Sequence, residues 1–230
     1  MKPLSKLNIA CGPNIFPFDG WINADKYDFA SYFAFVANPQ VPLSGMPDHQ
    51  RKLANFLRSG ADMRFMLHDM TKPFEEISDS SLEYIYCGQA IEHLNRRTQA
   101  PVFLADCLRM LQPGGVLRMA TPDLAKILDA FRLGEMNRFD SDQPDFYKTA
   151  GRYEQLAYLL FGASGDNCTA ERYEGHFFCY SPESIETLLL SCGFKEVAFT
   201  WCGSSAKRPD IAKEVRDEGY SHSLIVEAIR

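Results

Sequence analysis

Short apolar segments alternate with helix-like segments along most of the chain. Buried strands are predicted at residues 7–11, 21–25, 63–67, 82–87, 116–120, 195–201 and 223–229. Helices are predicted at 49–59, 101–111, 123–133, 153–161, 181–192 and 211–218, with a helix or turn at 90–94. This alternation is typical of an α/β fold with a mainly parallel sheet and helices on both faces.

Two long segments interrupt the alternation, at about residues 26–60 and 124–178. For a chain of 230 residues we predict a single domain in which these two insertions form a lid. The first insertion carries a dense aromatic cluster, namely Tyr27, Phe29, Tyr32, Phe33 and Phe35. We interpret this cluster as a packed lid or small subcore. The alternatives are a wall of a substrate site and the contact surface of a homodimer.

Glycine and polar residues follow the predicted strands. Gly12 has no Cβ, so the backbone can turn sharply there and let a ligand approach. In an open α/β sheet, ligands bind beyond the C-terminal ends of the strands. Asp25, Asp69, Gln89 and Asp123 each end or follow a later strand. The pattern therefore predicts that these residues surround one crevice.

A nicotinamide cofactor would require a different pattern at the same place. The dinucleotide fingerprint has G-x-G-x-x-G after the first strand and an acidic residue about 20 positions further on. Residues 11–16 read Cys-Gly-Pro-Asn-Ile-Phe, and Asp25 lies only 13 positions after Gly12. A nicotinamide-dependent oxidoreductase is therefore the less favoured alternative. Two prolines after Gly12 resist a regular helix, so a compact loop or a single turn is predicted between the first two strands.

The charge of the chain narrows the choice of partners. The formal net charge is −6, so no global basic field attracts phosphate backbones. The usual Pro-Cys motif of cytosine-C5 nucleophiles is absent, and the fourth strand lacks the N/D-P-P-Y turn of many base-amino methyltransferases. We therefore expect no nucleic-acid partner.

The seven cysteines indicate a reducing compartment. Their number is odd and no C-x-x-C pair occurs, which favours neither a disulfide framework nor a metal site. Residues 1–6 contain no apolar signal segment, and no apolar run approaches the length of about 18 residues that a membrane span needs. We expect a cytoplasmic protein that makes no membrane contact.

Several short motifs occur in a fixed order. They are Leu7-Asn8-Ile9-Ala10-Cys11-Gly12-Pro13-Asn14, Gly20-Trp21-Ile22-Asn23-Ala24-Asp25, His68-Asp69-Met70, Tyr84-Ile85-Tyr86-Cys87, Glu92-His93-Leu94, Leu111-Gln112-Pro113-Gly114-Gly115, Gly193-Phe194 and Ser223-Leu224-Ile225-Val226-Glu227-Ala228. Together they resemble class I S-adenosylmethionine-dependent methyltransferases, and more closely the bacterial group with a G-W-I-N-x-D second strand and an E-H-L turn. The resemblance implies a Rossmann-like, doubly wound, seven-stranded sheet of order 3-2-1-4-5-7-6 with the last strand antiparallel.

The resemblance also implies residues that bind S-adenosylmethionine. Asp25 would accept hydrogen bonds from both ribose hydroxyls, because a carboxylate offers two acceptor oxygens. Asp69 would accept one from the adenine amine, and the Met70 backbone would donate one to a ring nitrogen. The strand ends at Gly12, Gly88 and Gln89 would line the methionine part. The full candidate set is Asn8, Ala10, Cys11, Gly12, Asp25, Asp69, Met70, Gly88 and Gln89.

Three residues are candidates for the acceptor side of the site: His93, Asp123 and His176. Asp123 follows the fifth strand and would contact the acceptor. His176 stands between a glycine and two phenylalanines, so it is either a buried core histidine or a base in the substrate pocket. Glu92 and His93 alternatively cap and pack the following helix.

These inferences together predict an enzyme that methylates an oxygen or nitrogen of a small-molecule or glycan-like acceptor. The alternative is a partner protein that binds S-adenosylmethionine without catalysis, because no residue is an unmistakable base. Proximity alone can carry a methyl transfer, so the lack of such a base does not decide between the two.

Overall fold

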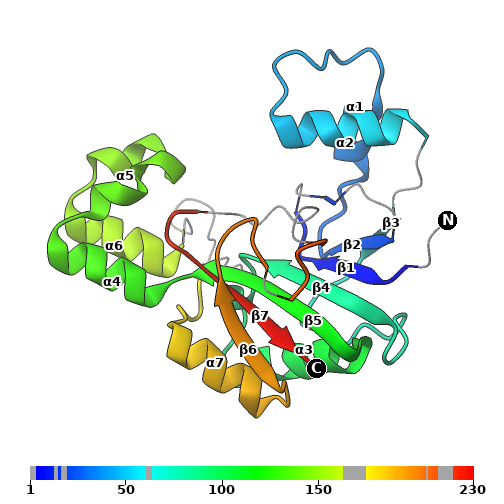
Figure 1. Ribbon diagram of the computed structural model, residues 1–230. Helices are drawn as coiled ribbons and strands as arrows, with labels where there is room; N and C mark the ends of the chain where they lie inside the picture. Colours follow the sequence, from blue (N-terminus) through cyan, green and yellow to red (C-terminus); the bar gives the residue numbers. More distant parts are fainter. Residues whose placement is uncertain are drawn as a thin grey trace.

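The computed structural model describes residues 4–12, 15–16, 20–60, 64–162, 175–205, 207–211 and 220–230. Its centre is a seven-stranded sheet of order β3-β2-β1-β4-β5-β7-β6. The last strand, β7, runs antiparallel to both β5 and β6, while β1 to β5 are parallel (Figure 1). The predicted strand order and the antiparallel last strand are confirmed.

The strands are β1 (Lys6–Ile9), β2 (Trp21–Asp25), β3 (Arg64–Leu67), β4 (Leu82–Gly88), β5 (Leu111–Pro122), β6 (Glu196–Thr200) and β7 (Ser223–Ile229). The α-helices are α1 (Ala30–Ala37), α2 (Asp48–Arg58), α3 (Ala100–Met110), α4 (Leu124–Leu133), α5 (Asp145–Thr149), α6 (Arg152–Phe161) and α7 (Pro182–Ser191). Two 3-10 helices, η1 (Ile91–His93) and η2 (Met136–Asp142), complete the described elements. All strands except β5, and the predicted helices that fall on described residues, lie within a few residues of their predicted positions.

Strand β5 corrects one prediction. The proline and two glycines at 113–115 were expected to form a turn before a strand at Val116, but β5 already begins at Leu111. Leu111 pairs with Leu82, and Val116 pairs with Tyr84, so the extra residues form an irregularity inside the strand. Gly114 has a φ of 78°, a conformation that a glycine adopts without strain. The turn-forming residues are thus accommodated within the strand.

The insertions contain helices that the sequence pattern did not predict. Helix α1 lies within the aromatic part of the first insertion, and η2 and α5 lie in the polar stretch 134–148, which was expected to separate two helices. These short helices are stabilised mainly by tertiary packing, which a local pattern does not reveal. The helix predicted at 211–218 and the loop predicted from Ala163 onward fall mostly outside the described residues.

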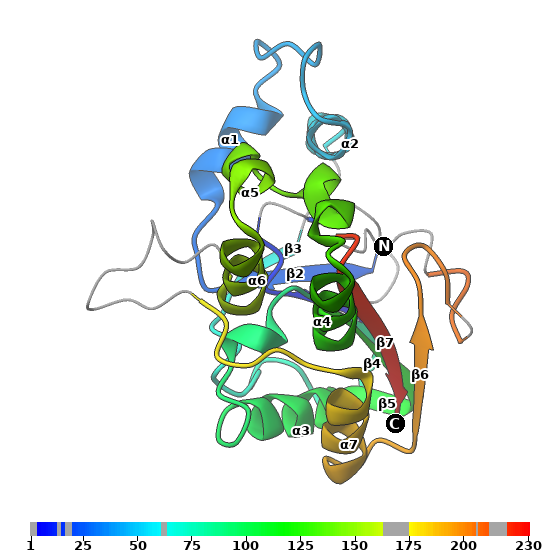
Figure 2. The same ribbon diagram turned by 90° about the vertical axis from the view of Figure 1, so that its left-hand side faces the viewer.

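The two faces of the sheet are covered in different ways. Along β4, Ile85 and Cys87 belong to the main hydrophobic core, to which α3 and α7 contribute. Figures 1 and 2 show these two helices together below the sheet. The alternate residues Tyr84 and Tyr86 belong to an aromatic cluster with Phe16, Trp21, Val116 and Ile211 on the opposite face. This alternation follows from the period of two in a strand.

Each insertion forms a small hydrophobic cluster of its own. Val36, Leu53 and Ala54 are buried between α1 and α2, and Ile127, Phe139 and Tyr147 are buried among α4, η2 and α5. Figure 1 shows the two insertions apart from each other, with α1 and α2 above β3 and α4 to α6 beyond the other end of the sheet. Tyr32 and Phe33 of the aromatic cluster pack against the residues buried between α1 and α2, so this part of the aromatic cluster belongs to a subcore. Whether the insertions act as a lid stays a prediction.

The second insertion leaves and rejoins the sheet at one place. Asp123, just before α4, forms a parallel bridge with Tyr180, just before α7. The Leu124 N–H donates to the Tyr180 carbonyl at 2.9 Å.

Within the described residues, no helix is both long and apolar enough to cross a bilayer.

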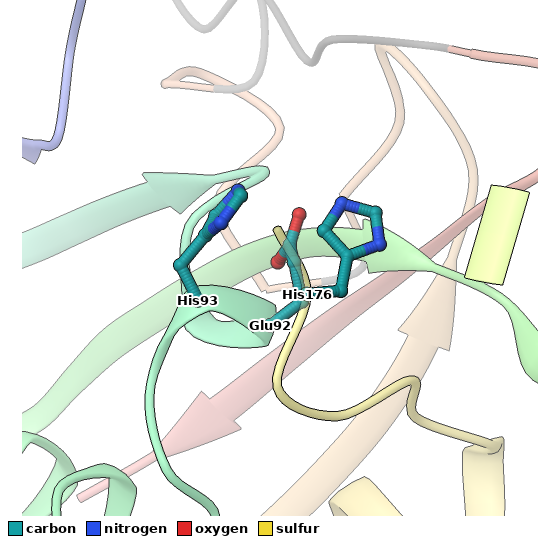
Figure 3. A group of neighbouring side chains, drawn as sticks. All are labelled: Glu92, His93 and His176. Atoms are coloured by element: carbon teal, nitrogen blue, oxygen red, sulfur yellow. The ribbon is translucent and has the colours of Figure 1, made fainter. Parts of the chain in front are cut away.

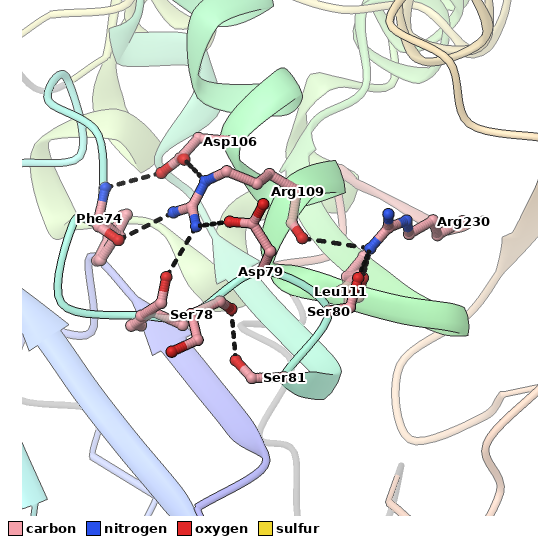
Figure 4. Close-up of polar contacts among 10 residues, drawn as sticks. Phe74, Ser78, Asp79, Ser80, Ser81, Asp106, Arg109, Leu111 and Arg230 are labelled. Carbon is pink, nitrogen blue, oxygen red and sulfur yellow. Dashed lines mark hydrogen bonds and ion pairs between the residues drawn. The ribbon is translucent and has the colours of Figure 1, made fainter.

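An arginine on α3 fixes the loop that follows β3. The Arg109 guanidinium donates to the carbonyls of Phe74 and Ile77 and to the carboxylates of Asp79 and Asp106, at 2.7–2.9 Å (Figure 4). Asp106 also accepts the Phe74 N–H at 2.8 Å. Since this loop begins at the C-terminal end of β3, the network holds that edge of the sheet in place.

A row of buried polar residues crosses the face that carries the aromatic cluster. In register across β2, β1, β4, β5 and β7 lie Asn23, Asn8, Tyr86, Arg118 and Glu227. Asn8 donates to Asn23 Oδ1 at 2.9 Å, and Asn23 Oδ1 also accepts the Phe16 N–H. Arg118 forms an ion pair with Glu227 at 2.8 Å, and both side chains are 0% exposed. Arg118 also donates to the Ser204 carbonyl, so the row holds the adjoining loops.

We expect Glu227→Gln to lower the free energy of unfolding by about 3–5 kcal/mol, because it leaves a buried guanidinium without its counter-charge. The double variant Arg118→Met/Glu227→Leu should be more stable than Glu227→Gln, since it buries no charge. Urea denaturation measures both. Asp129→Asn removes an exposed ion pair with Arg132 and should change stability by less than about 0.5 kcal/mol. A loss from Glu227→Gln as small as that of Asp129→Asn would contradict the prediction.

Candidate functional site

A cavity of about 300 Å³ lies beyond the C-terminal ends of β1 to β4. This is the size of a small-molecule site. The residues that line it are Ala10, Asp25, Lys26, Tyr27, His68, Asp69, Met70, Thr71, Gln89, Ala90, His93 and Leu94. They come from the segments that follow four neighbouring strands, as expected for an open α/β sheet.

Asp25 is the best-defined side chain of the cavity. It is 6% exposed, and its two oxygens accept the N–H groups of Gly12, at 2.8 Å, and Tyr27, at 2.9 Å. Burial raises the pKa of Asp25, although the Gly12 N–H and the charge of Lys26 oppose the rise. The two N–H groups fix the orientation of the carboxylate, and they bind the loop after β1 to the end of β2.

Asp69 lies on the same cavity, just after β3. Its Oδ1 accepts the Thr71 N–H at 2.9 Å. Burial raises the pKa of Asp69, but the hydrogen bonds from Thr71 and the charges of Lys26 and Lys72 outweigh burial and lower the pKa overall. The His68 N–H donates to the Asp25 carbonyl at 2.8 Å, so the backbone links the two aspartate-bearing segments.

Two lining residues have a strained backbone. Ala10 and Gln89 have φ values of 52° and 51°, in a region that residues with a Cβ rarely adopt. The Gln89 N–H donates to the Ala120 carbonyl at 2.7 Å, and its side chain donates to Ser223 Oγ at 2.9 Å. Strain of this kind often marks a functional site. Ala10 directly follows β1 and Gln89 directly follows β4, so both lie where these strands reach the cavity.

Four members of the expected cofactor set lie outside the cavity lining: Asn8, Cys11, Gly12 and Gly88. Asn8 is paired with Asn23 in the polar row, and Cys11 is buried. Gly12 contributes through the hydrogen bond that holds Asp25. A side chain at Gly88 would overlap the Tyr86 ring, which explains the glycine by packing. Their direct contact with a cofactor stays a prediction.

The three acceptor-side candidates have different positions. His93 lines the cavity, whereas Asp123 and His176 do not. Asp123 is the N-cap of α4, where it accepts the N–H groups of Ala125 and Lys126. This capping accounts for an aspartate at the position, so a contact between Asp123 and the acceptor stays a prediction.

The rings of His93 and His176 lie side by side, with centroids 5.1 Å apart. Burial and the neighbouring His93 lower the pKa of His176 to about 4. The His176 ring is therefore neutral at neutral pH. Glu92, which precedes His93, is completely buried.

Sequence reasoning missed several lining residues. Lys26, Tyr27, His68, Thr71, Ala90 and Leu94 line the cavity beside the predicted members. Each lies within two residues of a predicted one. The cavity is therefore lined by continuous segments that follow the strands, and the sequence predicts these segments better than it predicts the single residues within them.

No model of a protein family and no curated protein sequence matches the chain. Solved structures do match. An S-adenosylmethionine-dependent methyltransferase from Mesorhizobium loti is 17% identical, with 99% of this chain and 91% of that chain covered and a TM-score of 0.50. One from Methanosarcina mazei is 14% identical, with 98% and 92% covered and a TM-score of 0.51. The PH0226 protein from Pyrococcus horikoshii is 15% identical, with 100% and 83% covered and a TM-score of 0.52.

The chain has the Rossmann-like fold of S-adenosylmethionine-dependent methyltransferases. At these identities the likeness concerns the fold alone. The cavity lies at the strand ends of the sheet that defines this fold.

The strain at Ala10 predicts that Ala10→Gly is tolerated. Relief of a left-handed conformation, worth about 1–2 kcal/mol, offsets the lost burial of one methyl group, worth about 0.8 kcal/mol. Ala10→Val should destabilise, because a β-branched residue fits this conformation poorly. The matched control is Ala34→Gly on the exposed side of α1, which should cost about 1 kcal/mol. Urea denaturation compares the three, and equal losses from Ala10→Gly and Ala34→Gly would be inconsistent with strain at Ala10.

Proposed function

We propose that the chain is an S-adenosylmethionine-dependent methyltransferase acting on an oxygen or nitrogen of a small-molecule or glycan-like acceptor. The observation that carries this proposal is the position of Asp25 and Asp69 on one cavity at the ends of adjacent strands. The fold and the ordered motifs that resemble the bacterial G-W-I-N-x-D group support it.

The donor set of the cavity fits the nucleoside part of the cofactor. The buried Asp25 carboxylate is preset by two backbone N–H groups and retains lone pairs for the ribose hydroxyls. Asp69, whose ionised form is favoured by its surroundings, suits the adenine amine. The Met70 backbone lies beside it on the same wall.

Ala10 and Gln89 belong to the strand ends beside Asp25, where the methionine part of the cofactor would lie. Bound there, the cofactor supplies a methyl group that is already activated on a sulfonium sulfur. The protein has to hold an acceptor in line with that group and exclude water from it. We assign the contact with the acceptor to His93, which lines the same cavity.

The decisive experiment is calorimetric titration with S-adenosylmethionine. Asp25→Ala should weaken binding at least about 100-fold, since hydrogen bonds to a charged group contribute about 1.5–3 kcal/mol each. Asp28→Ala is the matched control, because Asp28 is exposed, accepts the Ala30 N–H and is not among the residues that line the cavity. It should bind as the wild type does. A wild type that binds no cofactor, or equal binding by the two variants, would refute the proposal.

Turnover separates an enzyme from a partner protein that only binds the cofactor. With a labelled methyl donor and a panel of small hydroxylated and amino-bearing acceptors, the wild type should label at least one acceptor, and Asp25→Ala should not. Cofactor binding without transfer to any acceptor of the panel or of a cell extract would favour the non-catalytic alternative.

A further inference from the structure

Glu92, His93 and His176 form a compact group at the border of the cavity. One ligand-type atom from each residue lies within 4.8 Å of the other two. Figure 3 shows the Glu92 carboxylate between the two imidazole rings. Two histidines and one carboxylate in such an arrangement are a known ligand set for transition-metal ions.

The backbone brings the three residues together. Glu92 and His93 belong to η1, whereas His176 belongs to the segment that returns from the second insertion. The N–H groups of Phe177 and Phe178 donate to the Glu92 carbonyl at 2.8 and 3.3 Å. The His176 N–H donates to the Phe161 carbonyl at 3.0 Å. The group is therefore fixed by main-chain hydrogen bonds, which is the rigidity that a metal site requires.

Both imidazole rings are oriented by backbone carbonyls. His93 Nδ1 lies 3.2 Å from the Gly175 carbonyl, and His176 Nδ1 lies 3.2 Å from the Leu160 carbonyl. A proton on each Nδ1 satisfies these carbonyls and places the lone pair on Nε2. Metal-binding histidines are commonly held by this second interaction.

Glu92 supplies the negative charge of the group. Its side chain is 0% exposed, and its Oε2 accepts the Thr121 hydroxyl at 3.0 Å. A buried carboxylate is costly unless charge or hydrogen bonds compensate it. A cation beside the carboxylate provides such compensation, and the hydroxyl of Thr121 would orient Glu92 toward it.

We propose that Glu92, His93 and His176 bind one divalent first-row transition ion of the Zn²⁺ type. Imidazole ligands favour such ions over Mg²⁺ and Ca²⁺, which prefer oxygen ligands. Bonds of about 2.0–2.2 Å require the three atoms to come closer together than the 4.8 Å within which they lie. The exposed side chain of His93 supplies that freedom, because it is the least confined of the three.

The position of His93 gives the ion a place in the chemistry of the site. His93 belongs both to the group and to the cavity lining, so the ion stands at the border of the cavity. Three protein ligands leave a coordination position open, as in catalytic zinc sites. An oxygen of the acceptor is the ligand that we assign to that position. This assignment rests on the proposed function, whereas binding of the ion does not.

Titration of untagged, metal-free protein with Co²⁺ and Zn²⁺, without S-adenosylmethionine, tests the site. Wild type should bind one Co²⁺ with visible d–d absorption and without a thiolate charge-transfer band, which excludes binding at the exposed Cys202. Zn²⁺ should displace the Co²⁺, and millimolar Mg²⁺ should not. His93→Asn and His176→Asn should each weaken binding about 10–100-fold or more, and Glu92→Gln should do likewise.

The controls separate ligation from folding and from the proposed function. His68→Ala removes another histidine of the cavity and should bind Co²⁺ as the wild type does. Circular dichroism of the metal-free variants checks the fold. Because His93 is exposed, His93→Asn changes a metal ligand without changing the hydrophobic core. Absence of one-to-one binding by the wild type, or unchanged binding by folded His93→Asn and His176→Asn, would overturn the proposal. Because cofactor binding is measured separately through Asp25, either proposal can fail alone.

Discussion

The sheet depends on one buried ion pair, between Arg118 and Glu227, and on the polar row that continues it across the strands. One face of the sheet carries α3 and α7, which need no polar partners there. On the other face, residues 15–16 and 201–204 are described as irregular segments, whose carbonyl and N–H groups need partners once they are buried. Arg118 and Asn23 supply them to Ser204, Trp201 and Phe16. The ion pair and the buried amide thus bind the described parts of these segments to this face.

Hydrogen bonds to backbone groups also shape the cavity. Since β1 to β4 are parallel, their C-terminal ends meet at one edge, where the next segments must leave in different directions. The carboxylate of Asp25 holds the segment after β1, and the Asp25 carbonyl holds the segment after β3. Arg109 also holds the segment after β3, through the Phe74 carbonyl. The residues expected to bind a ligand are therefore also the residues that shape the space for it.

The sequence predicts the sheet better than it predicts the site. Strand positions and order follow from apolar segments and from ordered motifs, and Ser181 caps α7 as expected. The irregularity in β5 was missed because its pairing with Leu82 overrides the local turn preference of Pro113 and Gly114. The meeting of Glu92 with His176 was missed for a different reason. It depends on hydrogen bonds between segments far apart in the chain, so no spacing of metal-binding residues along the sequence predicts it.

The bridge between Asp123 and Tyr180 makes the second insertion a module with adjacent ends. A segment whose ends already touch can be lengthened, shortened or exchanged without moving the strands that it connects. The insertion can therefore change while the sheet stays constant. Such an exchange would replace His176 and leave Glu92 and His93 in place, so it would remove one of the three proposed metal ligands from the border of the cavity.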